Sequence, residues 1–282
     1  MKRGWGDYQT NKRKFSIPVL TYHHVSPEGD FINVKPQIFE AQMRYLSEHG
    51  FTTLHTDEFM SILSGKKIPP KKSLMITFDD GWLDNWLVAF PILKKYGIKA
   101  VIFVITSLIA EKGRRHRVDE GTSVRLPDHK ECQKMIQEGH ASEVMLSWEE
   151  ITEMLKSGLI EIQSHTHTHK RWDKLYKDTA KQIDNLNREL KTSKKVIEEK
   201  LDSRCNALCW PQGKYIKDYV DLAMSLGYEL LFTTEKGANT QGTEPWKIRR
   251  IVIGNISLLT FRKKLFIHSR SWISKAYLRV FK

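Results

Sequence analysis

Along most of the chain, short apolar runs alternate with longer segments in which apolar residues recur every three or four positions. Short apolar or β-branched runs are typical of buried strands, and the longer spacing is typical of helices with one buried face. The pattern predicts strands near residues 17–25, 51–55, 74–78, 99–106, 159–163, 228–234 and 248–253. It predicts helices near residues 36–49, 86–96, 130–140, 147–158, 179–201 and 218–226, with a further helix that begins at residue 56.

The order of these elements predicts the fold class. Strand 74–78, the helix after it and strand 99–106 fit within about thirty residues, which is typical of a strand–helix–strand unit with parallel strands. Six to eight strands in such an alternation predict a barrel-like α/β fold in one domain, residues 16–256. Residues 111–146 break the alternation and are interpreted as an insertion at the edge or mouth of the sheet. Residues 1–15 are interpreted as a flexible basic tail.

Composition narrows the class of protein. With 282 residues, 40% hydrophobic and 28% charged, the chain is typical of a soluble globular protein. The three cysteines do not suit a disulfide framework and favour a reducing compartment. The basic amino terminus lacks the apolar core of a signal peptide, so a cytoplasmic location is expected. The net charge of +13 favours an anionic partner, but no nucleic-acid-binding motif is present, and we expect no nucleic-acid partner.

Two neighbouring carboxylates follow the apolar run 74–78. Asp79 and Asp80 lie where the predicted strand ends and the chain turns, so both side chains can reach one site. Like charges in one crevice repel each other, and a metal ion is a natural way to hold them together. The sequence therefore predicts a metal site at this strand end.

Candidate ligands for the rest of this site come from a second strand end. His165, His167 and His169 follow the apolar run 159–163 at alternate positions. All three share one face if the segment is extended, whereas His165 and His169 become neighbours if the strand ends at Ser164 and the chain turns. One carboxylate and two imidazoles make a mixed oxygen and nitrogen site with open positions for water. A second carboxylate beside such water can accept its proton, which predicts a hydrolase.

Three ordered motifs resemble those of the polysaccharide deacetylases with the NodB-homology fold, a carbohydrate esterase family 4-like group. They are residues 77–81 (Thr-Phe-Asp-Asp-Gly), 164–169 (Ser-His-Thr-His-Thr-His) and 210–213 (Trp-Pro-Gln-Gly). The resemblance spans roughly residues 17–255. It implies a distorted (β/α)7 barrel that hydrolyses N-acetyl groups of amino sugars with one divalent metal ion. Zn²⁺ is the expected ion, with Co²⁺, Ni²⁺ and Mn²⁺ as alternatives.

The resemblance also implies roles for individual residues. Asp79 is expected to be the general base, and Asp80, His165 and His169 are expected to bind the metal. The backbone N–H of Gln212 is expected to hold the developing oxyanion, a role that needs no particular side chain. The turn expected to line the substrate groove consists of Trp210, Pro211 and Gln212.

The chain departs from the family pattern in three places. Cys209 replaces the usual arginine, Gln212 replaces an aromatic residue, and the late histidine motif that usually supplies the general acid is not recognisable. Arg250 is expected to replace the arginine and orient Asp79, with Arg249 as its competitor.

A substitute for the general acid is offered by residues 22–24. This segment resembles the start of the subgroup that includes the poly-N-acetylglucosamine deacetylases, in which a histidine at the beginning of the barrel can fill the role. His23 is the expected acid and His24 its alternative, and Tyr22 and His24 are expected to contact substrate.

The carboxyl-terminal segment, residues 257–282, has the pattern of a basic amphipathic helix. One face carries apolar residues and another carries Lys275, Arg279 and Lys282. Such a helix can lie on an anionic membrane or pack on the barrel, and the sequence leaves both open. The apolar face consists of Trp272, Ile273, Ala276, Tyr277, Val280 and Phe281.

Together these features predict a metal-dependent amino-sugar N-deacetylase. The expected substrate is a lipid-linked sugar or polysaccharide precursor of envelope or surface-polysaccharide assembly, at the inner face of the membrane. Two alternatives use the same residues: an inactive barrel that binds glycan or membrane, and an iron(II)-dependent oxygenase with a two-histidine, one-carboxylate site.

Overall fold

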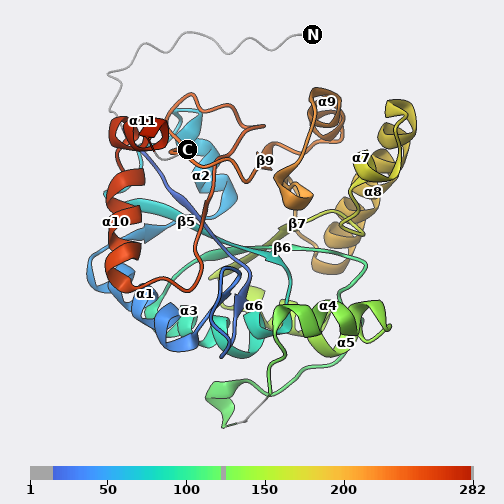
Figure 1. The fold of residues 1–282 in the computed structure, drawn as a ribbon, viewed down its shortest axis with the longest axis horizontal. Coiled ribbons are helices and arrows are strands. Elements are labelled where there is room, and N and C mark those ends of the chain that lie inside the picture. Colours follow the sequence, from blue (N-terminus) through green and yellow to red (C-terminus); the bar gives the residue numbers. More distant parts are fainter. Residues whose placement is uncertain (1–14, 122–124, 281–282) are drawn as a thin grey trace.

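The computed structural model describes residues 15–121 and 125–280. Its main element is a parallel sheet in the strand order β10-β1-β5-β6-β7-β8-β9, with β4 paired to the start of β5 (Figure 1). The strands are β1 (Val19–Tyr22), β4 (Thr52–Thr53), β5 (Ser73–Asp80), β6 (Ala100–Val104), β7 (Ile160–Ser164), β8 (Ala207–Cys209), β9 (Leu230–Phe232) and β10 (Ile251–Val252).

The two ends of this sheet are connected through residues 248–252. Ile248 forms a parallel bridge to Phe232 of β9, and β10 then pairs with β1 at the other end of the sheet. The sheet is thereby curled into a distorted barrel with parallel strands and helices outside. This confirms the α/β barrel that the alternation of strands and helices predicts.

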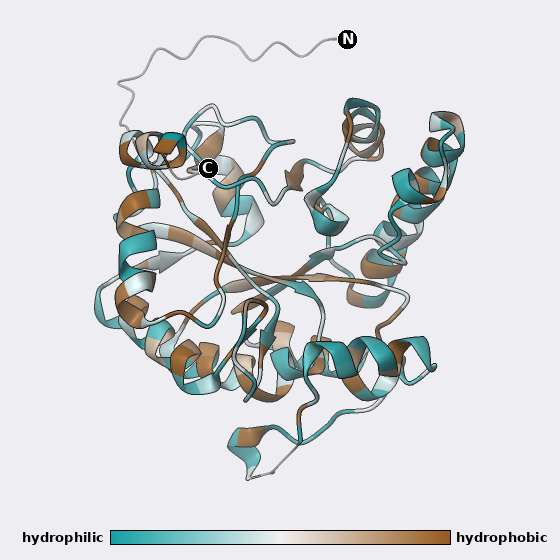
Figure 2. Cartoon of the chain, in the orientation of Figure 1, coloured by the Kyte–Doolittle hydropathy of each residue, from teal (hydrophilic) through white to brown (hydrophobic). Residues whose placement is uncertain are grey.

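Alternate residues of the strands pack on opposite faces of the sheet. In β6, Val101 and Phe103 belong to a cluster with Met75 that fills the barrel. Ile102 and Val104 belong to a larger cluster between the sheet and the surrounding helices. Hydrophobic residues accordingly follow the central strands in Figure 2, whereas the outer helices carry most of the hydrophilic ones. Both faces are buried, as is typical of a parallel sheet.

Helices cover the outside of the barrel close to the positions that the sequence predicts. Helix α8 spans Thr179–Leu201, as expected. After β5, however, the chain forms a π-helical turn, η1 (Asn85–Ala89), before α3 (Phe90–Tyr96), where one continuous helix is expected. Pro91, in the first turn of α3, has no N–H with which to continue the α-helical hydrogen bonds. The other outer helices are α1 (Pro36–Glu48), α6 (Trp148–Lys156), α7 (Trp172–Leu175) and α9 (Lys217–Ser225). Helix α2 (Thr56–Leu63) instead packs Phe59, Ile62 and Leu63 on the cluster inside the barrel.

The described parts of the predicted insertion, residues 111–121 and 125–146, lie beside the carboxyl end of β5. They include η2 (Val118–Glu120) and two helices that pack on each other, α4 (His129–Gln137) and α5 (Ala141–Val144) (Figure 1). Val144 and Met145 pack against Trp82, two residues after Asp80. A separate pair of short strands, β2 (His24–Val25) and β3 (Asn33–Val34), also follows the barrel's first strand. These segments supply walls to the barrel mouth.

Two helices end the described chain, α10 (Leu258–His268) and α11 (Ser271–Val280). α10 packs on the barrel through Phe261 and Leu265, which are buried, whereas Trp272 of α11 is 71% exposed. No helix among residues 15–121 and 125–280 combines the length and apolar character needed to cross a membrane. The expected basic tail, apart from Phe15, and the predicted apolar position Phe281 lie outside the described residues.

Candidate active site

Asp79 and Asp80 are the last two residues of β5, where they pair with Phe103 and Val104 of β6. The sequence pattern ends the strand before them, but in the structure they still belong to it. Their side chains therefore leave the strand on different sides. Asp79 continues the face that points into the barrel, whereas Asp80 has a left-handed backbone with φ of 77°. Both carboxylates line one pocket, yet each has its own set of partners.

Asp80, His165 and His169 form a compact set of candidate metal ligands. The Nε2 atoms of His165 and His169 lie 3.4 and 3.9 Å from Asp80 Oδ1. One ligand atom from each of the three residues lies within 4.8 Å of the others. A carboxylate oxygen and two imidazole nitrogens at such separations fit a divalent ion that keeps open positions for water.

The two histidines come together because β7 ends at Ser164 and the chain turns. Thr166 and His169 have left-handed φ angles of 67° and 57°. The turn is held by the His169 N–H, which donates to Thr166 Oγ1 over 3.0 Å. Left-handed conformations cost bulky residues about 1–3 kcal/mol each and gather at functional sites. His167 instead directs Nδ1 to Thr106 Oγ1 at 2.9 Å. Of the two arrangements that the sequence leaves open, the chain adopts the turn.

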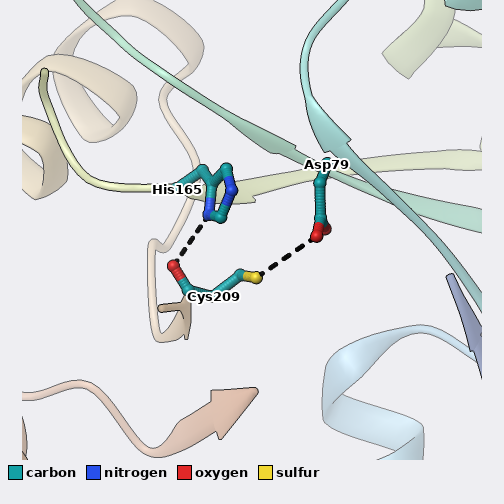
Figure 3. Close-up of side chains that lie close together, drawn as sticks. All are labelled: Asp79, His165 and Cys209. Atoms are coloured by element: carbon teal, nitrogen blue, oxygen red, sulfur yellow. Dashed lines mark hydrogen bonds between the residues drawn. The ribbon is translucent and has the colours of Figure 1, made fainter. Parts of the chain in front are cut away.

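Neighbouring groups fix the orientation of the candidate ligands. Trp82 Nε1 donates a hydrogen bond of 2.9 Å to Asp80 Oδ2, which leaves Oδ1 facing the histidines. His165 Nδ1 donates to the backbone carbonyl of Cys209 over 2.8 Å (Figure 3), which directs its Nε2 toward Asp80. Burial opposes the charge of His165, but Cys209 and the Asp80 carboxylate outweigh it and raise the pKa of His165, so a metal ion would take the place of the proton on Nε2. Burial lowers the pKa of His169 to about 4, and its imidazole is neutral, as metal binding requires.

A second cluster with metal-ligand atoms overlaps the first. Asp79, His165 and the Cys209 thiol also place one ligand atom each within 4.8 Å of one another (Figure 3). Asp79, however, is already held by Arg250. Burial raises the pKa of Cys209, so the sulfur stays a thiol, and it lies 3.6 Å from Asp79 Oδ2 as a weak donor. The Asp80 cluster is therefore the better metal site.

Arg250 binds Asp79 through both carboxylate oxygens, at 2.7 and 2.8 Å. Burial opposes the charge of Asp79, but the Arg250 guanidinium outweighs it and holds the pKa of Asp79 below its usual value. The carboxylate is therefore ionised and precisely oriented by a paired cation. Arg249, the competing candidate, directs its side chain toward Gly237 and makes no ion pair among the described residues.

The expected general acid also faces this carboxylate. His23 Nε2 lies 3.8 Å from Asp79 Oδ2, and its side chain is 21% exposed. Burial lowers the pKa of His23, although Asp79 and Asp80 oppose that effect. Of the two neighbouring histidines, His23 is the one that lines the pocket.

The pocket at the barrel mouth has a volume of about 240 Å³. One wall is the turn after β8, η3 (Pro211–Gly213), in which Gln212 has a left-handed φ of 55°. Gly213 is required there, because its φ is 65° and a Cβ would lie 2.2 Å from Thr234 Oγ1. Trp210, also in this wall, has a buried indole N–H without a partner among the described residues. The opposite wall includes Ile32, His129 and Gln133.

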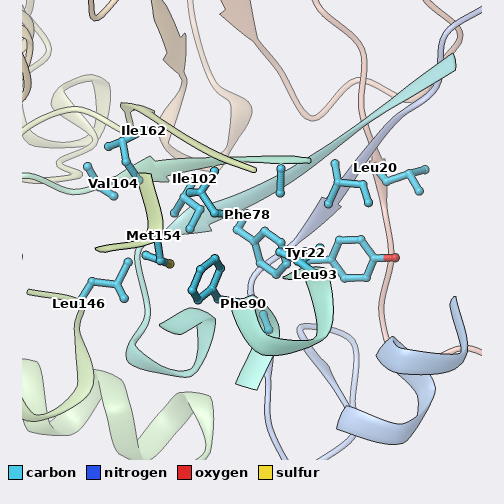
Figure 4. Close-up of a cluster of buried hydrophobic side chains, with 14 of the residues drawn as sticks. Leu20, Tyr22, Phe78, Phe90, Leu93, Ile102, Val104, Leu146, Met154 and Ile162 are labelled. Carbon is cyan, nitrogen blue, oxygen red and sulfur yellow. The ribbon is translucent and has the colours of Figure 1, made fainter. Parts of the chain in front are cut away.

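Three residues assigned to substrate from the sequence do not line this pocket. Tyr22 lies in the core, where its ring packs on Phe78 and its hydroxyl donates to Gln42 over 2.8 Å (Figure 4). Its position in β1 places it on the face toward the helices, so the assignment of Tyr22 is wrong. His24 is fully buried behind the pocket, and Pro211 points into a neighbouring crevice. Alternate residues of β1 face opposite sides of the sheet, which directs Tyr22 away from the pocket. The tight turn after β8 directs Pro211 away from it.

The structure adds residues that the sequence pattern did not single out. Asp84 accepts a hydrogen bond of 2.5 Å from His24 Nδ1, and His24 Nε2 then accepts one of 3.0 Å from His129 Nδ1. These two hydrogen bonds fix the ring of His129, which lines the pocket together with Gln133. Trp82 has a sequence signal, since it follows Asp80 closely. His129 has none, because it comes from the insertion, fifty residues away in sequence from the aspartates.

A parallel α/β barrel whose mouth holds an Arg-paired aspartate beside a possible Asp/His/His metal site has the arrangement of a hydrolase. The family model for polysaccharide deacetylases matches residues 66–231. YxkH of Bacillus subtilis, named for the same family, is 31% identical over 235 residues, covering 83% of this chain and 70% of YxkH. The chain belongs to the polysaccharide deacetylase family and is an N-deacetylase by class.

Other relatives agree with this membership. The poly-beta-1,6-N-acetyl-D-glucosamine N-deacetylase of Staphylococcus aureus (strain MRSA252) is 26% identical over 250 residues, covering 88% of this chain and 77% of that protein. The structure of Streptococcus pyogenes deacetylase PplD in complex with acetate is similar, with a TM-score of 0.70 and 27% identity over 89% of this chain and 98% of that one.

Proposed function

We propose that this chain is a metal-dependent hydrolase that removes N-acetyl groups from an amino sugar within a polysaccharide or its lipid-linked precursor. The observation that carries the proposal is that two adjacent aspartates have different partners. Asp80 faces two histidines, while Asp79 is held as a free, ionised carboxylate by Arg250. The similarity to the Staphylococcus aureus poly-beta-1,6-N-acetyl-D-glucosamine N-deacetylase supports an N-acetylated amino-sugar polymer as the substrate class.

The metal ion would be held by Asp80, His165 and His169. This donor set, one carboxylate and two imidazoles, suits Zn²⁺, with Co²⁺, Ni²⁺ and Mn²⁺ as alternatives. When bound, such an ion supplies a Lewis acid that polarises the acetamide carbonyl and acidifies water. Trp82 and the Cys209 carbonyl keep two of the three ligands in the orientation that binding requires.

The chemistry of the chain itself rests on Asp79 and His23. Asp79 is ionised and accepts the proton of the water that attacks the acetamide carbon. Arg250 keeps that carboxylate oriented throughout. His23, 3.8 Å from Asp79, donates a proton to the departing amine nitrogen, and the backbone N–H of Gln212 is assigned to the developing oxyanion. The products are acetate and a free amino sugar.

We also propose a location for the enzyme. The net charge of +13 and the exposed basic residues of α10 and α11 favour work at an anionic membrane. We therefore place the enzyme in the cytoplasm at the inner face of the membrane, on precursors of envelope or surface polysaccharide.

The test compares Asp79→Asn with Asp80→Asn on β-1,6-linked N-acetylglucosamine oligomers. Asp79→Asn should lower kcat roughly 10²–10⁴-fold, the usual contribution of a general base, while the folded protein keeps its metal. Asp80→Asn should lose the metal as well as activity. Acetate release and metal content per chain are the two measurements. Metal loss in Asp79→Asn with retention in Asp80→Asn would mean that the two roles are exchanged.

Two other functions use the same residues. A barrel without activity is suggested by Cys209 and Gln212, but Arg250 takes the place of the missing arginine at the base. An iron(II) oxygenase would use the Asp80 cluster with oxygen and a 2-oxo acid. Oxygen consumption without acetate release would support that alternative.

A further inference from the structure

A second hollow lies at the opposite end of the barrel from the catalytic pocket. It has a volume of about 550 Å³ and lies between the turn before β5 and helix α10. Ser73, the first residue of β5, lines it, whereas Asp79 and Asp80 at the other end of β5 line the catalytic pocket. A strand of this length spans roughly 25 Å. We call this hollow the basal groove and define it by Ile68, Lys71, Lys72, Arg262, Phe266 and Arg270.

The charge of the basal groove is of one sign. Lys71, Lys72, Arg262 and Arg270 line it, and no Asp or Glu among residues 15–121 and 125–280 does. Within the described part of the chain, none of these four cations forms an ion pair with a carboxylate. Exposed cations elsewhere on the surface, such as Lys95 with Glu40 and Lys217 with Asp221, do have an acidic partner.

Three of the four cations, Lys72, Arg262 and Arg270, are held in place by aromatic and backbone groups instead. The Arg270 guanidinium carbon lies 4.0 Å from the centre of the Phe266 ring, and Nη1 donates to the Phe266 carbonyl over 3.0 Å. Arg262 lies over Tyr45, at 5.3 Å. Lys72 donates to the His49 carbonyl at 2.8 Å. Their side chains are thus ordered, while their charge is left without a counter-charge.

Large apolar side chains are exposed among these cations. Ile68 is 68% exposed and Phe266 is 53% exposed, on the two sides of the groove. On α10, Leu259 is 75% exposed and lies on the same helix face as Arg262 and Phe266, since the spacing is three and seven residues. Apolar residues beside unpaired cations are the combination that recognises an anionic lipid surface, where phosphates meet acyl chains.

We propose that the basal groove is a membrane-docking surface for anionic phospholipid. The lipid phosphates bind Lys71, Lys72, Arg262 and Arg270, and Ile68 and Phe266 enter the boundary between headgroups and acyl chains. Because the groove and the catalytic pocket lie at opposite ends of β5, docking leaves the pocket open, roughly 25 Å from the lipid surface, to a sugar chain that extends away from the membrane. The surface is separate from the catalytic residues, so this proposal stands or falls independently of the proposed reaction.

The test is sedimentation of the full chain with vesicles of phosphatidylcholine alone and with added phosphatidylglycerol. The chain should bind the anionic vesicles, and binding should weaken as NaCl is raised, because salt screens charges at this distance. Each Lys or Arg near an anionic surface contributes roughly fivefold in the partition coefficient, so Lys71→Gln/Lys72→Gln should bind roughly 30-fold more weakly. Phe266→Ser should also reduce binding.

Matched controls separate the groove from the overall charge. Lys134→Gln/Lys195→Gln removes two exposed lysines on α4 and α8, and Met224→Ser removes a partly exposed apolar side chain on α9. Both should bind vesicles as the wild type does. All variants should keep the circular dichroism spectrum and the unfolding midpoint of the wild type, which shows that they fold.

The proposal is overturned if Lys71→Gln/Lys72→Gln and its matched control lose binding equally, which would indicate charge alone. It is also overturned if vesicle binding ignores the phosphatidylglycerol content, or if inorganic phosphate at the concentration of the lipid displaces the vesicles completely. That last result would make the groove a site for a free phosphate group.

Discussion

The Arg250–Asp79 ion pair gives the sharpest prediction of stability. Arg250 is 2% exposed and Asp79 is 3% exposed, and two hydrogen bonds of 2.7 and 2.8 Å join them. Arg250→Met keeps most of the side-chain volume but leaves the buried carboxylate without its counter-charge. Breaking a buried pair in this way costs roughly 3–5 kcal/mol, which for a chain of this size lowers Tm by roughly 6–20 °C.

The chain offers a neighbouring control for this change. Arg249→Met removes the same charge from a side chain without an ion pair among the described residues, and it should change stability by about 0.5 kcal/mol or less. The double variant Asp79→Asn/Arg250→Met removes both charges, and it should recover part of the loss because no unpaired charge remains. Urea unfolding, followed by circular dichroism with a chelator present, measures all four proteins without a contribution from metal binding.

The loss of stability in Arg250→Met should also depend on pH. In the wild type the pKa of Asp79 is held below its usual value, so the pair stabilises the fold above the ordinary aspartate pKa and less as pH falls through it. Burial raises the pKa of Asp79, and without Arg250 this effect is no longer outweighed. The ionised Asp79 carboxylate therefore destabilises the fold of Arg250→Met at neutral pH. The difference between wild type and Arg250→Met should therefore shrink as pH falls through about 4. Equal losses for Arg250→Met and Arg249→Met, or a difference that does not vary with pH, would refute this reasoning.

Two further predictions concern residues that only the structure singles out. Trp82→Phe removes the hydrogen bond to Asp80 and should weaken metal affinity roughly 10–100-fold, measured by competition with a chromogenic chelator. Trp272→Phe, on exposed α11, should leave the affinity unchanged, and an equal loss in both variants would contradict a specific role. His129→Ala removes a pocket-lining imidazole and should raise KM for an N-acetylglucosamine oligomer roughly 2–10-fold with unchanged metal content. The exposed insertion histidine in His140→Ala is its control, and a loss confined to kcat would argue against a binding role.

The residues of the candidate metal site could be predicted from the sequence, because they lie at the ends of predicted strands. The carboxyl ends of parallel strands meet at one edge, so motifs 79–80 and 165–169 are expected to converge without knowledge of the helices between them. Local chain geometry was harder. The pattern ended the strand before Asp79, whereas Asp79 and Asp80 still pair with β6, and this pairing separates their side chains.

Other assignments depend on contacts between distant segments. Tyr22 belongs to a continuous apolar run, so the sequence does not tell which of its residues face the inside of the barrel. The fold directs Tyr22 into the core between the sheet and the helices. The choice of Arg250 over Arg249 follows from which side chain enters the barrel from the segment that joins β9 to β1.

The sequence alone determined the alternation of strands and helices, the family resemblance and the residue types of the metal cluster, since these depend on local spacing and side-chain chemistry. The tertiary structure decided which atoms meet: the arginine that charges Asp79, the histidine from the insertion at the pocket wall, and the unpaired cations of the basal groove. Such pairings depend on the distances between segments remote in sequence, and only folding fixes those distances.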